Sequence, residues 1–246
     1  MASKSEVGHA KNVANFVTLY VICEGYALLY NPSKNSIKLV TFDAKKTASA
    51  AKQSAVNALY PAYDEAQDAR KILFAPLSSL TTDILNGVKA SEVTKGFIAD
   101  VKTLANKIRG IRSTPKPVDI PDTDQDESKN FHSTSQMSFD LRLDNFDKLI
   151  ALLGSNSGYA PNETPIKVIT LKALYTAMLA ANKAVIDAFN PLDNARIARD
   201  VELYHEETGL VTVAADVKFY IKSAFGSTSA QFKQVSKLKF VRPKKD

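Results

Sequence analysis

The sequence carries one pattern twice, and this repeat limits the folds that the chain can adopt. Identical residues at a fixed separation of 129 positions include Tyr30 with Tyr159, Pro32 with Pro161, Ile37 with Ile166, Val56 with Val185 and Arg70 with Arg199. At a separation of 130, Asn15 and Phe16 match Asn145 and Phe146, and KIRGIR at 107–112 aligns with KLKFVR at 237–242. The repeat predicts two related structural modules, one from about 13 to 112 and one from about 143 to 242.

Both copies have the hydrophobic periodicity of an α-helix. Alanines dominate a stripe with 3/4 spacing in each, and the stripe includes Ala51 in the first copy and Ala180 in the second. This pattern predicts long second helices over 36–74 and 165–206, with the alanines packed tightly against a neighbouring helix. Pro61 and Pro191 fall inside these helices, where a kink or a break is expected. The predicted fold is all-α: an internally duplicated helical bundle of two similar units with long alanine-rich second helices.

Charge and composition divide the chain into three parts. Residues 1–112 form the expected first helical repeat unit, and 138–246 form the second, with a basic tail. Residues 113–137 between them are rich in proline, serine and acidic side chains and nearly devoid of apolar ones. Proline disfavours helix interiors and a polar segment has little to bury, so we expect an exposed linker there.

Two stretches of the second copy carry a resemblance: SQMSFDLRLDNFDKLIALL at 135–153 and VKFYIKSAFGSTSAQFKQVSKLKF at 217–240. They resemble a family of uncharacterised, internally duplicated bacterial helical proteins, over most of the chain. The resemblance implies an all-α fold. That family has no assigned activity, so the resemblance implies no site residues.

Several features predict the cytoplasm as the location. The N-terminal stretch has no apolar core typical of a signal peptide, and Cys23 is the single cysteine, which excludes an internal disulfide. The longest apolar run is broken by Glu24, so no transmembrane segment is expected. Export by a route without a signal peptide stays open.

Motifs for catalysis are missing from the sequence. It contains no G-x-S-x-G, no Walker A motif and no G-x-G-x-x-G. Cys23 lies on an apolar helix face and is expected to be buried and inert. Glu202 and His205 share a helix face as in half of a di-iron motif, but the first copy has Leu73 and Pro76 at the matching places. We therefore expect no enzyme, no cofactor and no metal.

Basic residues gather at the end of each copy. The six that we single out as a candidate polyanion site are Lys107, Arg109, Arg112, Lys237, Lys239 and Arg242. Cations are also favoured at helix C-termini by the helix dipole, which gives these residues a structural explanation. Four functions follow, in order of preference: a scaffold that binds a protein partner or itself, a protein that binds nucleic acid or another polyanion, a membrane-active toxin, and an enzyme.

Overall fold

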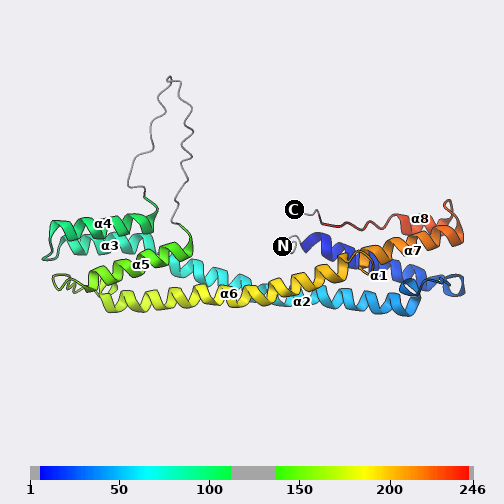
Figure 1. Cartoon of the computed structure of the whole chain (residues 1–246), viewed down its shortest axis with the longest axis horizontal. Coiled ribbons are helices and arrows are strands. Elements are labelled where there is room, and N and C mark those ends of the chain that lie inside the picture. Colours follow the sequence, from blue (N-terminus) through cyan, green and yellow to red (C-terminus); the bar gives the residue numbers. More distant parts are fainter. Residues whose placement is uncertain (1–5, 112–136, 244–246) are drawn as a thin grey trace, which may run out of the picture. The chain divides into compact units, whose positions relative to one another are not determined.

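The computed structural model describes residues 6–111 and 137–243, and they are helical with no β-strand among them (Figure 1). The elements of the first half are α1 (Glu6–Gly25), η1 (Ala27–Leu29), η2 (Asn35–Ile37), α2 (Leu39–Phe74), α3 (Leu77–Lys89) and α4 (Lys95–Arg109). Those of the second half are α5 (Phe139–Gly154), η3 (Thr164–Ile166), α6 (Val168–Tyr204), α7 (Leu210–Phe225) and α8 (Ala230–Ser236). The all-α prediction is confirmed. The linker predicted over 113–137 lies outside the described residues except for Met137.

The same local structure precedes both long helices. Tyr30 and Tyr159 are buried, and each phenol donates a hydrogen bond to a backbone carbonyl seven residues later, to Ile37 at 2.7 Å and to Ile166 at 2.8 Å. Each accepting carbonyl belongs to the last residue of a short 3-10 helix, η2 or η3. The tyrosine thereby fixes the turn through which the chain enters α2 or α6.

The buried side of the long helices is not the alanine stripe. On α2 the buried positions are Phe42, Ser49, Gln53, Val56 and Phe74. Their counterparts 129 residues later are Leu171, Met178, Asn182, Val185 and Leu203, and all of them are buried as well. Ala51 and Ala180 are exposed, so the prediction that they pack against a neighbouring helix is wrong. Alanine has the highest helix propensity of any residue, and here it supports the solvent-facing side of both helices.

Neither proline breaks its helix. Pro61 lies inside the 36-residue helix α2, and Pro191 lies inside the 37-residue helix α6. A proline removes one backbone hydrogen bond and crowds the preceding turn. In helices of this length the turns on both sides stay formed, so the alternative of a break is excluded.

By packing, the chain divides into two compact units. Unit 1 comprises Met1–Asp64 with Asp187–Asp246, and unit 2 comprises Glu65–Ile186. Neither coincides with the repeat units expected over 1–112 and 138–246, because contacts and not positions along the chain define the compact units.

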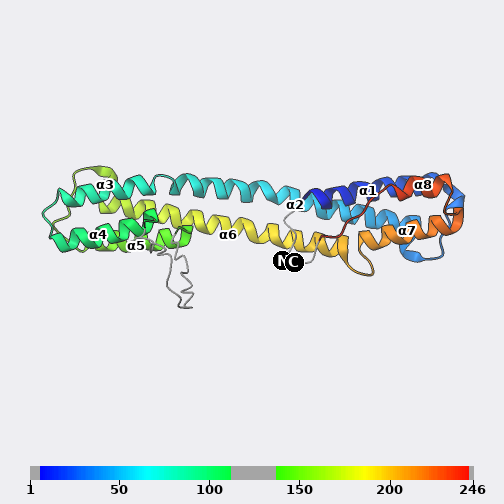
Figure 2. The same cartoon turned by 90° about the horizontal axis from the view of Figure 1, so that it is seen from above.

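In unit 1, α1 of the first half packs against α7 of the second half, and α7 packs against α8 (Figures 1 and 2). Its core contains Phe16, Leu19, Phe42, Val213 and Val217.

Unit 2 also combines helices from both halves of the sequence. There α5 of the second half packs against α4 of the first half, and α4 packs against α3. The core contains Ile84, Val101, Phe146, Leu149 and Leu153. Each compact unit therefore draws its buried residues from both halves of the sequence.

Candidate functional site

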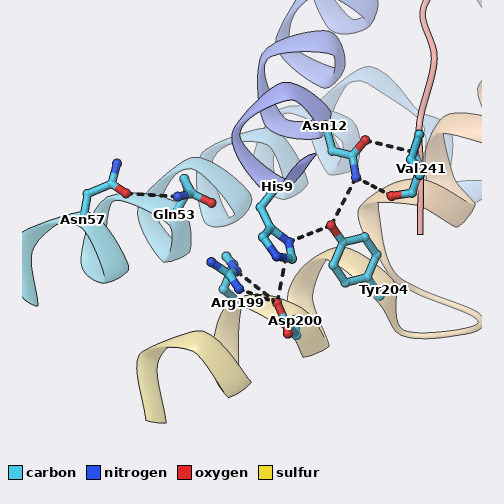
Figure 3. A network of polar contacts seen from close by, with 8 residues as sticks. All are labelled: His9, Asn12, Gln53, Asn57, Arg199, Asp200, Tyr204 and Val241. Atoms are coloured by element: carbon cyan, nitrogen blue, oxygen red, sulfur yellow. Dashed lines mark hydrogen bonds and ion pairs between the residues drawn. The ribbon is translucent and has the colours of Figure 1, made fainter. Parts of the chain in front are cut away.

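An extended segment of backbone lies against α1 in unit 1, and asparagines hold it there (Figure 3). Helix α8 ends at Ser236, and the chain from 238 to 243 has no regular secondary structure. The Asn12 side chain donates through Nδ2 to the carbonyl of Val241 at 2.8 Å and accepts through Oδ1 from the N–H of Val241 at 3.0 Å. One helical turn later, Asn15 Nδ2 donates to the carbonyl of Lys239 at 2.7 Å. We call residues 238–242 the strap.

The side chains of the strap alternate between the core and the solvent, as they do in a β-strand. Leu238 and Phe240 are half-buried and pack against the core of unit 1, whereas Lys239 and Val241 are exposed. The Phe240 ring lies edge-on to Phe16, with ring centroids 6.5 Å apart. The contacts of the strap are thus of two kinds: hydrogen bonds to its backbone and apolar contacts from every second side chain.

Helix α7 contributes one cation to the contacts of the strap. Lys218 donates from Nζ to the carbonyl of Leu238, and its ammonium lies 5.1 Å from the centroid of the Phe240 ring. Burial lowers the pKa of Lys218, because a partly desolvated ammonium is less stable in its charged form. The carbonyl and the aromatic face offset part of that cost.

A buried polar network lies beneath the end of the strap (Figure 3). His9 Nδ1 is 2.7 Å from Tyr204 Oη and 3.7 Å from Asp200 Oδ1. Asn12 Nδ2 also donates to Tyr204 Oη, at 3.2 Å. The Arg199 guanidinium is fully buried, and its Nε and Nη2 each lie 2.9 Å from Asp200 Oδ1.

This network combines groups that could relay a proton, but its location favours a structural role. His9 is only 2 % exposed, and burial is the main cause that raises the pKa of the Tyr204 phenol. Arg242 donates to the carbonyl of Tyr204 and to Thr212 Oγ1, so the strap closes over the end of α6. A charged pair that is buried in this way is costly to disrupt, because removal of one partner leaves the other uncompensated.

The position equivalent to Arg199 has different partners in unit 2. Arg70 places its guanidinium carbon 4.0 Å from the centroid of the Phe139 ring, and Phe139 packs edge-on against Phe74. Phe139 stands 130 positions after His9. The matched arginine thus lies in a polar network in unit 1 and against an aromatic ring in unit 2.

The predicted polyanion residues are divided between the two units. In unit 2, Lys107 is exposed, and Arg109 donates to Asn106 Oδ1 at 2.8 Å and to Thr82 Oγ1 at 3.1 Å. In unit 1, Lys237 and Lys239 are exposed, and Arg242 makes the contacts given above. Arg112 lies outside the described residues.

The other residues considered for chemistry have structural surroundings. Cys23 is buried, as predicted, and its burial raises the pKa of the thiol to about 12. Glu202 forms an ion pair with Lys45 at 3.0 Å. His205 Nδ1 accepts from the backbone N–H groups of Glu207 and Thr208. Among the residues that the structure describes, no three His, Cys, Asp or Glu side chains form a group able to hold a metal ion.

Unit 2 has an acidic cavity of about 810 Å³ at the end of α3. Its lining includes Asp83, Glu92 and Glu163, together with backbone and small side chains of the loop before η3.

Within the described helices, none is both long and apolar enough to cross a bilayer.

Comparison with protein-family models, with curated proteins and with solved structures finds no match to this chain. The resemblance stated from the sequence therefore stays a prediction. Sequence reasoning missed the role of Asn12 and Tyr204. Asn12 contacts Val241, 229 positions later, and the carbonyl of Tyr204 accepts from Arg242, 38 positions later. Asn145 matches Asn15 in sequence but donates to the carbonyl of Leu141 in its own helix, so the match does not indicate the contact of Asn15 with the strap.

Proposed function

We propose that the chain is a non-enzymatic interaction protein of the cytoplasm, an internally duplicated helical scaffold that binds a protein partner or a second copy of itself. The duplication is supported by the matched buried positions of α2 and α6 and by the shared tyrosine hydrogen bonds. The binding role is supported by one observation above all: the surface of α1 already holds an extended segment of the chain through that segment's backbone.

Backbone contacts are independent of sequence, so the same surface would accept an extended segment from another chain. Specificity would come from the pattern of the strap, LKFVR at 238–242. Two apolar side chains two residues apart enter the core, and an arginine follows two residues later. A segment of this pattern in a partner, or the strap of a second copy, would bind this surface in the same way.

The test is a peptide titration. A chain that ends at Ser236 is compared with the full chain for binding of a fluorescent peptide with the sequence SKLKFVRP, residues 236–243, by anisotropy. We expect the shortened chain to bind the peptide and the full chain to bind at least tenfold more weakly, because its own strap competes at high effective concentration.

Two matched variants make the test specific to the hydrogen bonds between Asn12 and Val241. Asn12→Ala in the shortened chain removes both hydrogen bonds to Val241, and Val241→Pro in the peptide removes the N–H donor; each should weaken binding. A shortened chain that is helical by circular dichroism and does not bind the peptide would contradict the proposal. Light scattering of the full chain over a range of concentrations tests whether copies exchange straps.

A second candidate function is polyanion binding, and a charge pattern favours it. Residues 217–243 contain six basic side chains and no acidic one. A nucleic acid held by such a surface would lose affinity steeply with added salt, because each neutralised phosphate releases counterions. A DNA titration at low and physiological salt tests it, with Lys107, Arg109, Arg112, Lys237, Lys239 and Arg242 changed to Gln in the variant. Equal binding by wild type and variant would exclude this role for these residues.

A further inference from the structure

Two leucines protrude at the end of unit 1. Leu28 is 98 % exposed and Leu29 is 68 % exposed, and both lie in η1, directly after α1. A single exposed apolar side chain is common on protein surfaces, but here two adjacent leucines are exposed together. Their placement at the tip of a short loop needs a reason other than the core.

The loop is anchored on both sides of the leucines. Before them, the Tyr26 ring packs against Phe225 with centroids 5.2 Å apart, and its Oη donates to the carbonyl of Gln231 at 3.3 Å. After them, Tyr30 is buried and donates to the carbonyl of Ile37. Between the two anchors, Ala27 has a φ of 49°, a left-handed conformation that non-glycine residues rarely adopt. The fold thus holds Leu28 and Leu29 away from the core.

The second half shows that the fold does not require these leucines. The positions 129 residues later are Ser157 and Gly158, which precede Tyr159 as Leu28 and Leu29 precede Tyr30. Both tyrosines make the same hydrogen bond. The turn therefore forms equally well with small residues, and the leucine pair belongs to unit 1 alone.

The surface next to the leucines is basic. The contacts of Tyr26 place η1 beside the end of α7 and the start of α8, and both figures show this loop at the same end of unit 1 as the α7–α8 turn. Two lysines lie on these segments, Lys222 in the last turn of α7 and Lys233 in α8, and from 222 to 240 the chain has no acidic residue. Both lysines are exposed, whereas Lys239 lies farther from the loop, beside Asn15 of α1. The nearest acidic side chain on α1 is Glu24, which accepts from Tyr20.

We propose that this tip of unit 1 docks on an anionic lipid surface, with Leu28 and Leu29 inserted among the acyl chains and the lysines over the headgroups. Protruding apolar side chains beside exposed cations are the combination that such a surface binds, through apolar burial and electrostatic attraction together. Nucleic acid would use the lysines but would leave the leucines in water. A second copy of this chain is disfavoured, because two leucines offer far less than the roughly 1,200 Å² that a stable protein interface buries. The proposal deepens the polyanion candidate by naming the anionic surface.

The test is co-sedimentation of the full chain with vesicles of phosphatidylcholine alone or of phosphatidylcholine mixed with phosphatidylserine, an anionic lipid of the cytoplasmic leaflet. We expect binding to the anionic vesicles only, and weaker binding at high salt. Leu28→Ser with Leu29→Gly installs the residues of the second half and should reduce the partition coefficient at least tenfold. Ile169→Ser is the matched control, since Ile169 is 74 % exposed on α6 in unit 2, and it should bind as wild type does.

The remaining outcomes distinguish the alternatives. No sedimentation of the wild type with anionic vesicles overturns the proposal, and so does equal binding by the leucine variant. If the wild type and the leucine variant bind a short DNA duplex equally and neither binds vesicles, the lipid proposal fails while the polyanion candidate stands. If the leucine change abolishes self-association in light scattering and leaves vesicle binding intact, the tip is a contact between copies and the lipid proposal fails.

Discussion

The carboxamide of Asn12 makes both hydrogen bonds that the backbone of Val241 can offer: its Oδ1 accepts from the N–H at 3.0 Å, and its Nδ2 donates to the carbonyl at 2.8 Å. The two residues are 229 positions apart. This contact ties the last described segment of the chain to its first helix.

Removal of the Asn12 side chain should loosen the strap before the rest of unit 1. Asn12→Ala deletes the two hydrogen bonds to Val241 and the one to Tyr204 Oη, so we expect a loss of about 1–3 kcal/mol in the free energy of unfolding. Hydrogen exchange should rise at residues 238–242 before it rises in α7, because the strap has few other backbone contacts. Asn15→Ala, which removes one hydrogen bond at an exposed site, should have a smaller effect. Unchanged exchange in the strap of Asn12→Ala would show that the apolar contacts of Leu238 and Phe240 suffice.

The buried tyrosines should make the protein sensitive to alkali. Burial raises the pKa of Tyr159 from its ordinary value near 10 to about 12. Between these values the unfolded chain has released the proton and the folded chain retains it, so stability falls as pH rises from 10 to 12. Tyr159→Phe should lower stability at neutral pH by about 1–2 kcal/mol, since the carbonyl of Ile166 loses its donor, and should flatten the decline above pH 10. Urea unfolding at several pH values measures both effects, with the exposed Tyr60→Phe as control; an equally steep decline in Tyr159→Phe would assign it to other groups.

The two faces of the long helices should respond oppositely to substitution. Ala51→Leu and Ala180→Leu add bulk on exposed positions, so each should change stability by less than about 0.5 kcal/mol. Val56→Ala and Val185→Ala remove buried methyl groups, and each should cost about 1–3 kcal/mol. Thermal unfolding followed by circular dichroism compares the four variants. A large loss of stability in Ala51→Leu would show that this position packs against a neighbouring helix.

The halves of the sequence should fold together and not alone. Each compact unit takes helices from both halves, α1 with α7 in unit 1 and α5 with α4 in unit 2. A chain divided into 1–124 and 125–246 should therefore copurify as a 1:1 complex when both fragments are expressed, with only one of them tagged. Each fragment expressed alone should lack cooperative unfolding, because its apolar faces have no partner. A monomeric, cooperatively folded 1–124 fragment would contradict this.

The sequence by itself determined the helices, the repeated turns and the buried state of Cys23. These are local properties: the 3.6-residue periodicity and the residues near each helix end act over a few turns, so α2 and α6 lie close to the helices predicted over 36–74 and 165–206. Tyr30 and Tyr159 are identical residues 129 positions apart in the sequence, and the hydrogen bond that each makes spans only seven residues.

The tertiary structure alone decided which side of each long helix is buried and which helices meet. Alanine is compatible with a packed face and also stabilises an exposed one, so the Ala51 and Ala180 stripe gave no unique answer, whereas Phe42, Val56 and their counterparts face the cores. Likewise, α1 could have packed within its own half; that it packs against α7 depends on the fit of complete apolar surfaces far apart in the sequence. Asn12 meets Val241 only after that choice is made, which is why the residue pattern near Asn12 contains no sign of the strap.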